Sequence, residues 1–202
     1  MNCIKIWDAT NGQLKQIYKN PTKNEISCIK LEKRKRKLFI GDIEGEIISI
    51  NILNGAKMKY FSSHKKYVSS IDYFSEGKKF ISASWDGTIK IHDDDSNEEK
   101  GLQLFEFSHN VPGKINSCNT IDFSEELKIL ACGYDNGSVT LINMKSLSSE
   151  GTLSEHKKVT ICKFLEDYPG LIVCDQDCDI HFWTIILTKP KRMMKDYQFK
   201  NY

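Results

Sequence analysis

Residues 82–93 read SASWDGTIKIHD, and this stretch decides how the rest of the chain is interpreted. Its second half, TIKIH at residues 88–92, alternates polar and apolar residues, which is the pattern of a half-buried β-strand. A second apolar run, KFISA at residues 79–83, precedes it, and Asp86-Gly87 lies between the two runs. An Asp-Gly pair in this position predicts a tight turn, because glycine adopts positive φ without steric cost. We therefore expect a β-hairpin over residues 79–93.

The same hairpin pattern recurs along the chain. Its other copies are GDIEGEIISIN at residues 41–51, GYDNGSVTLIN at 133–143 and CDQDCDIHFWT at 174–184. The four predicted turns close 42, 50 and 41 positions apart, at Gly45, Gly87, Gly137 and Cys178. A period near 42 that is built from short strands predicts the blades of a β-propeller, at about 40–45 residues for each four-stranded blade.

This period divides the chain into blades. Residues 1–18 hold only the second half of a blade, in which IKIWD at residues 4–8 is the third strand. Full blades are expected at about 25–61, 64–107, 109–154 and 156–187, and a basic tail at 188–202. The fold class is therefore expected to be all-β, a propeller of which about four to four and a half blades are present. Such a set is an incomplete ring or a fragment of a larger propeller.

Composition argues against several other classes of protein. The 202 residues carry a formal net charge of +2, so no large field favours nucleic acid or a membrane as a partner. No apolar run approaches the roughly 18 residues that a membrane-spanning helix needs, and the first residues show no apolar signal segment. The seven cysteines, an odd number placed among strand positions, are expected to be reduced thiols in a cytoplasmic, reducing compartment.

A histidine precedes each of the last three hairpins. His64 lies 22 residues before Asp86, His109 lies 26 before Asp135, and His156 lies 21 before Asp177. Together with Trp7-Asp8 and Trp183, this order resembles the WD-repeat family, whose repeat runs from a Gly-His-like pair to a Trp-Asp pair. The resemblance covers nearly everything from residue 4 to residue 183.

The resemblance implies that His64, Ser82 and Asp86 form a buried, hydrogen-bonded chain in the best-preserved blade. His92 takes the place of the family's usual tryptophan as the fourth member. Serine, histidine and aspartate also occur in hydrolytic triads, but a triad needs an exposed nucleophile, whereas this spacing buries the serine in mid-strand. We therefore expect a network that satisfies buried polar groups, with no catalytic site and no cofactor.

The other blades keep fewer members of this network. In the copy at residues 109–154, His109 and Asp135 remain, while Ala131 stands at the serine position. In the last copy the expected members are His156, Asp177 and Trp183.

Three further patterns resemble ligand sites but lack necessary parts. DDDSN at residues 93–97 and DQDCD at 175–179 begin like calcium loops, but the required glycine and bidentate glutamate are missing. Cys174 and Cys178 have no second cysteine pair behind them, so no metal site is expected. The basic run KRKRK at residues 33–37 lies between two predicted strands, which favours a solvated turn over a nucleic-acid patch.

The wording of several loops resembles a subgroup of WD-repeat proteins from cilia and flagella, whose members often carry EF-hands elsewhere in a longer chain. The segments that carry this resemblance begin with KRKLFIGDIEG at residue 35, SSHKKYVSSIDY at 62, ISASWDGTIKIH at 81 and FLEDYPGLIVC at 164. The resemblance implies a non-catalytic, protein-binding scaffold of the axonemal cytoskeleton. Its expected partners are microtubule-associated complexes and further blades of the same or another chain. The alternative is a general cytosolic WD-repeat adaptor of another multiprotein complex.

Overall fold

The computed structural model describes residues 2–74, 78–95, 101–109, 115–154, 156–166, 168–187 and 197–201. The secondary structure within these ranges consists of eighteen β-strands. The described part of the chain thus contains no helix that could cross a membrane. The chain divides into two compact units, one formed by Met1–Ser84 with Ile89–Phe107 and the other by Trp85–Thr88 with Ser108–Tyr202.

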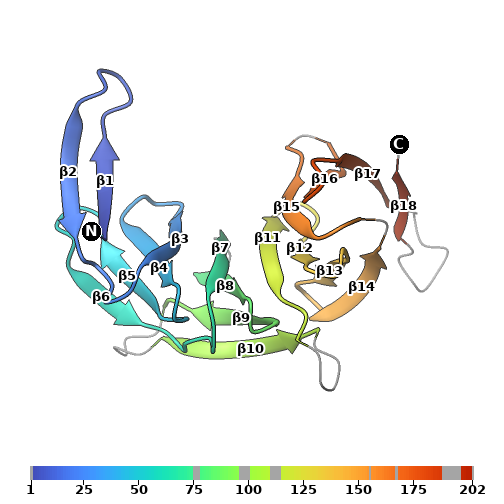
Figure 1. Cartoon of the computed structure of the whole chain (residues 1–202), viewed down its shortest axis with the longest axis horizontal. Helices are drawn as coiled ribbons and strands as arrows, with labels where there is room; N and C mark the ends of the chain where they lie inside the picture. The colour runs from blue at the N-terminus through green and yellow to red at the C-terminus, as the bar shows by residue number, and fades with distance from the viewer. Residues whose placement is uncertain are drawn as a thin grey trace. The chain divides into compact units, whose positions relative to one another are not determined.

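The first unit carries one two-stranded and two four-stranded sheets (Figure 1). The two-stranded sheet consists of β1 (Cys3–Trp7) and β2 (Leu14–Lys19). The next sheet consists of β3 (Ile26–Leu31), β4 (Lys37–Asp42), β5 (Ile47–Asn51) and β6 (Lys57–Tyr60). The third consists of β7 (Val68–Phe74), β8 (Lys79–Ser84), β9 (Thr88–Asp93) and β10 (Leu102–Ser108).

The second unit carries two sheets of four strands each. The first consists of β11 (Cys118–Ser124), β12 (Ile129–Tyr134), β13 (Val139–Asn143) and β14 (Ser148–Leu153). The second consists of β15 (Val159–Phe164), β16 (Gly170–Asp175), β17 (Ile180–Leu187) and β18 (Tyr197–Asn201). In every sheet, strands that follow one another in the sequence are neighbours.

The predicted all-β fold with a hairpin at the centre of each blade is confirmed. β8 pairs antiparallel with β9, and the register runs from Lys79↔Asp93 to Ala83↔Ile89. The pairs β4–β5, β12–β13 and β16–β17 have the same antiparallel arrangement. Residues 33–36 of the basic run lie in an exposed turn between β3 and β4, whereas Lys37 begins β4, is half-buried and pairs with Asp94 at 2.7 Å.

The end of the chain differs from the expected basic tail. β18 pairs with β17, from Trp183↔Asn201 to Leu187↔Tyr197, and so supplies the fourth strand of the last sheet. Its sequence, YQFKN, alternates aromatic and polar residues, but the lysine-rich segment with Pro190 before it hides this pattern. The spacing of 50 residues between Gly87 and Gly137 predicts an insertion of about eight residues near 93–100 and 111–114. This insertion falls largely outside the described residues, as do residues 188–196.

The second strand is almost entirely buried in three of the four-stranded sheets, whereas Ile172 and Cys174 of β16 are half-buried. All residues of β4 and β8 after the first are buried, and so are all six of β12. The outer strand β10 instead alternates exposed and half-buried residues. Burial on both faces means that the central hairpins contact neighbouring sheets, so their side chains have to fit closely.

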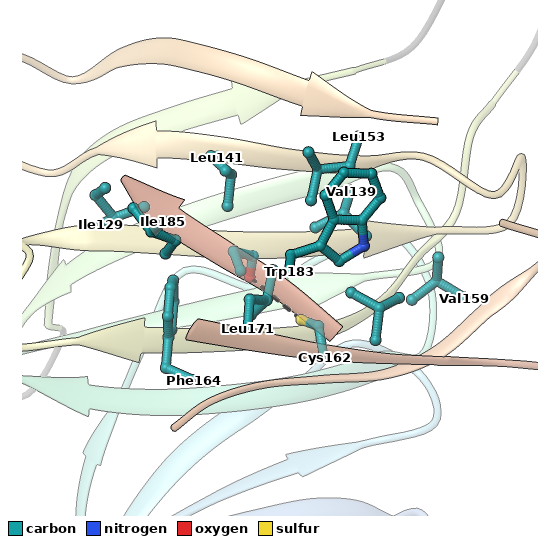
Figure 2. Close-up of a cluster of buried hydrophobic side chains, with 12 residues drawn as sticks. Ile129, Val139, Leu141, Leu153, Val159, Cys162, Phe164, Leu171, Trp183 and Ile185 are labelled. Carbon is teal, nitrogen blue, oxygen red and sulfur yellow. Dashed lines mark hydrogen bonds between the residues drawn. The ribbon is translucent and has the colours of Figure 1, made fainter. Parts of the chain in front are cut away.

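In the second unit, a cluster of buried side chains fills the space between the two sheets (Figure 2). β12 and β15 approach closely there, because Gly133 has no side chain. A Cβ atom at position 133 would lie 2.4 Å from Cγ1 of Val159. The first unit repeats this contact, since a Cβ at Gly41 would lie 2.7 Å from Val68.

Replacing Gly133 by alanine should destabilise the second unit through this contact. We expect Gly133→Ala to lower the free energy of unfolding by about 1–2 kcal/mol, because the added methyl group overlaps with Val159. In Gly133→Ala/Val159→Ala, the closest overlap, with Cγ1 of Val159, is removed, although Cγ2 of Thr120 stays 2.8 Å from the added Cβ. The combined loss should therefore fall short of the sum by about 1 kcal/mol. Urea unfolding of the four proteins measures this coupling, and strictly additive losses would contradict the packing argument.

Candidate functional site

Ser82 is the centre of a buried line of three side chains. Its hydroxyl lies 2.8 Å from Nε2 of His64 and 2.8 Å from Nε2 of His92. Ser82 and His92 are fully buried, and His64 is almost so. Because a hydroxyl has one proton to donate, Ser82 donates to one imidazole and accepts the N–H of the other. The line connects the segment before β7 with the two central strands of the sheet.

His92 packs as a neutral aromatic residue. Its ring stacks on Phe80 with the ring centroids 4.5 Å apart, and it meets the ring of Phe61 edge-on at 5.8 Å. Burial lowers the pKa of His92 to about 3, and the nearby charges of His64 and Lys90 act in the same direction. The imidazole therefore carries no charge at neutral pH.

Asp86 holds the turn between β8 and β9. Its Oδ1 accepts hydrogen bonds from the backbone N–H of Thr88 at 2.8 Å and from the Thr88 hydroxyl at 2.6 Å. Asn136 makes the same two bonds in the turn between β12 and β13, to the N–H of Ser138 at 3.0 Å and to its hydroxyl at 2.6 Å. A carboxylate oxygen in one turn and an amide oxygen in the other thus accept the same pair of hydrogen bonds.

Asp135 lies one residue away from the position that was predicted for it. Its side chain is 39% exposed and forms an ion pair with Lys158 at 2.9 Å. It also accepts a hydrogen bond from the side chain of Asn119 at 2.8 Å. Counting back from the residue that closes each turn places Asn136, and not Asp135, opposite Asp86. Asp135 shares its residue type with Asp86, but it lies two residues before the glycine that closes its turn, whereas Asp86 lies one residue before.

The same shift applies to the rest of this blade. Cys132, and not Ala131, stands at the serine position, and it is fully buried. A cysteine cannot replace the hydrogen bonds of a hydroxyl, since its S–H group is a weak donor. His109 instead stacks on the ring of Tyr134, with the ring centroids 4.9 Å apart.

In the last blade, two of the three predicted residues meet directly. Trp183 donates from Nε1 to Nε2 of His156 at 3.0 Å. The proton of the neutral His156 ring is therefore on Nδ1, which lies 3.1 Å from the carbonyl oxygen of Gly137. The third predicted residue, Asp177, is exposed, and its backbone N–H donates to Oδ1 of Asp175 at 3.1 Å.

Asp175 and Asp42 organise their turns, although neither was singled out from the sequence. Asp175 accepts the backbone N–H groups of Lys157, Asp177 and Asp179, each at 3.1 Å. Desolvation acts to raise the pKa of Asp175. The three N–H donors and the nearby His181 lower it by more, so the pKa lies below its ordinary value. A signal for both residues is present in the sequence, because each lies three positions before the residue that closes its turn.

Asp42 has the corresponding set of bonds in the first unit. It accepts the backbone N–H groups of Glu44 at 3.0 Å and Glu46 at 2.8 Å, and a hydrogen bond from the side chain of Asn24 at 3.0 Å. These arrangements hold turns in place. Ser82 is fully buried between two imidazoles, so it lacks the access to a substrate that a hydrolytic serine needs.

The burial of His92 makes stability depend on pH. The unfolded chain binds a proton at an ordinary histidine pKa of 6.5, whereas the folded-state pKa is about 3. The contribution of His92 is therefore complete above pH 6.5 and decreases as the pH falls towards 3. His92→Trp introduces the residue type that Trp183 has at the corresponding position, and it removes the pH-dependent contribution of His92 to stability. Between pH 7 and pH 5 we expect the unmodified chain to lose about 2 kcal/mol more than the variant in urea unfolding. The same loss in both proteins would contradict this assignment.

The role of Asp86 predicts a graded response to substitution. Asp86→Ala should lower the free energy of unfolding by about 1–2 kcal/mol, because Thr88 loses its acceptor. Asp86→Asn should lose less than half as much, since Asn136 makes the same bonds in its own turn. Asp135→Ala is the matched control and should cost at most about 0.5 kcal/mol, because it removes an exposed ion pair. If Asp135→Ala and Asp86→Ala have equal effects in chemical unfolding, the assignment of the turn residue is wrong.

The comparison with protein families identifies two repeats. The WD40 family (WD domain, G-beta repeat) matches residues 55–93 and 147–184. Each match begins with or just before the outer strand of one sheet, β6 or β14, and ends in the third strand of the next, β9 or β17. The sequence repeat and the four-stranded sheet are therefore offset by one strand.

Several curated proteins are similar to nearly the whole chain. Cilia- and flagella-associated protein 337 B of Tetrahymena thermophila is 26% identical over 206 residues, which cover 99% of this chain and 16% of that protein. Guanine nucleotide-binding protein subunit beta-1 of Nicotiana tabacum is 22% identical, with 90% of this chain and 50% of that protein covered. Apoptotic protease-activating factor 1 of Homo sapiens is 28% identical, with 91% and 14% covered. The chain thus spans half or less of each of these relatives. The repeats, the sheets and these similarities together show that the chain carries WD40 repeats and that its four-stranded antiparallel sheets are of the kind that forms WD40 blades.

Proposed function

We propose that the chain acts as a non-catalytic protein-interaction scaffold in the axoneme of cilia or flagella. The observation that carries this proposal is the similarity to a cilia- and flagella-associated protein over 99% of the chain. Its partners are then axonemal complexes associated with microtubules, together with further blades of the same or another chain. Neither nucleic acid nor a membrane is part of the proposal.

The geometry of the blades supports a binding role of this kind. Buried hydrogen bonds such as those of Ser82 and Asp86 hold the central hairpins in place, so the turn of each hairpin is rigid. One of these turns displays a large aromatic residue, Trp85, which is 42% exposed. Tryptophan at a rigid, exposed position is the residue type most often found at the energetic centre of a protein interface.

Tagged variants expressed in ciliated cells test the proposal. The unmodified chain should be found in the cilium and should stay with the axoneme when the membrane is removed with detergent. We expect Trp85→Ala to keep the melting temperature of the unmodified chain and to lose at least about tenfold of the axonemal signal, because an interface anchor costs about 2 kcal/mol or more. Leu53→Ala, which alters a residue that is 77% exposed in the turn after β5, is the control and should behave as the unmodified chain.

A general cytosolic adaptor is the second candidate function. The similarity to guanine nucleotide-binding and apoptotic proteins supports it, since those relatives carry no ciliary name. A tagged chain that is soluble in the cell body and absent from detergent-washed axonemes would favour this candidate and overturn the axonemal proposal.

A further inference from the structure

Three metal-ligating side chains meet at the turn between β16 and β17. Asp175 ends β16, Asp179 follows in the turn, and His181 is the second residue of β17. One possible ligand atom from each of the three lies within 4.8 Å of the others. Asp175 is buried, His181 is half-buried and Asp179 is exposed, so the group opens to solvent on one side. No other such group occurs among the described residues.

The distance between the imidazole and the buried carboxylate suits a shared ion. Nε2 of His181 lies 3.7 Å from Oδ2 of Asp175. This exceeds the 2.7–3.2 Å of an ordinary N–H···O hydrogen bond. Two ligands of one zinc ion, each at about 2.0–2.2 Å, are roughly 3.4–3.6 Å apart in tetrahedral geometry. The pair therefore needs only a small adjustment to bind a metal ion together.

Both of these side chains are held in place by neighbours. Asp175 is oriented by three backbone N–H groups, and only part of its acceptor capacity is used by them. The ring of His181 meets the ring of His156 edge-on, with the ring centroids 4.7 Å apart. Both ring nitrogens of His156 are in turn occupied, Nε2 by the N–H of Trp183 and Nδ1 by the carbonyl oxygen of Gly137. His156 thus positions His181 and is not itself available as a ligand.

The turn itself differs from the other three. Cys178 has a φ of 68°, a left-handed conformation that favours glycine, whereas Gly45, Gly87 and Gly137 occupy the corresponding positions. A side chain in this conformation persists where its surroundings hold the turn. An ion bound to Asp175 and Asp179 would connect the two sides of this turn.

The first unit contains a natural comparison for this group. In the turn between β4 and β5, Asp42 and Glu46 take the positions of Asp175 and Asp179, but Ile48 stands where His181 would be. The two turns share their carboxylates and their backbone hydrogen bonds. The imidazole of His181 is therefore the feature by which the turn between β16 and β17 differs from the turn between β4 and β5.

We propose that Asp175, Asp179 and His181 bind a divalent transition-metal ion of the zinc type, with water completing the coordination. One imidazole and two carboxylates form a donor set that suits zinc. Calcium is disfavoured, because it takes six to eight oxygen ligands. The ligand set differs both from the calcium-like pattern at residues 175–179 and from the cysteine pair at Cys174 and Cys178.

Zinc titration of the 202-residue chain by calorimetry tests the site. We expect one ion per chain, and a dissociation constant that is at least about tenfold higher in Asp179→Asn and in His181→Ala. Asp179 is exposed, so Asp179→Asn should not perturb folding, and circular dichroism checks this for each variant. Asp177→Asn and Glu46→Gln are the matched controls, and they should bind zinc as the unmodified chain does.

A cobalt substitution identifies the ligands. Binding through oxygen and nitrogen should give weak visible bands and no thiolate charge-transfer band in the near ultraviolet, and Cys178→Ser should leave the spectrum unchanged. A charge-transfer band that disappears in Cys178→Ser would assign the ion to the thiol and overturn the proposal. An absence of saturable zinc binding, or an affinity in Asp179→Asn and His181→Ala equal to that of the unmodified chain, would overturn it as well.

Discussion

The second strand of each four-stranded sheet ends in a buried residue, which is Asp42, Ser84, Tyr134 or Asp175, so the turn that follows has to satisfy its backbone N–H groups from within. An unpaired donor at such a place costs about 1–3 kcal/mol, which is a large part of the stability of a small domain. The chain meets this constraint in two ways. Asp42 and Asp175 reach forward into the turn from the end of the second strand, whereas Asp86 and Asn136 accept hydrogen bonds from the residue two positions ahead.

The same turns also receive the segment that enters the next blade. The backbone N–H of His64 donates to the carbonyl of Gly45 at 2.9 Å, and that of His109 donates to the carbonyl of Gly87 at 3.4 Å. His156 reaches the carbonyl of Gly137 with its ring nitrogen. A Cβ atom at Gly137 would lie only 2.0 Å from the carbonyl oxygen of His156, so the turn must be closed by a residue without a side chain there. This contact accounts for the recurrence of glycine at the turn, whereas His64 and His109 join it through their backbone N–H groups and His156 through its side chain.

A framework fixed in this way is suited to binding, because the residues that it exposes lose little conformational freedom when a partner arrives. The buried line through Ser82 fixes one hairpin, and the pair of His156 and Trp183 fixes another. Trp85 on one turn and the Asp175, Asp179 and His181 group on another are then two different uses of the same structural element. We propose that the first presents an apolar anchor to a protein and that the second presents ligands to an ion.

The sequence by itself determined the strands, the period and the hairpins, because these depend on alternation and on turn residues that are local in the chain. The family resemblance implied a network of His64, Ser82 and Asp86 with His92 as the fourth member, and the structure joins His64, Ser82 and His92 in one hydrogen-bonded line. Tertiary structure decided which polar residue faces the turn, since a shift of one position separates Asn136 from the exposed Asp135. It decided equally that Tyr197–Asn201 completes a sheet, because the pairing with β17 is made across a segment that shows no strand pattern. His181 joins Asp175 for a similar reason, as only the antiparallel pairing of β16 with β17 brings an imidazole and a carboxylate six residues apart to within 3.7 Å.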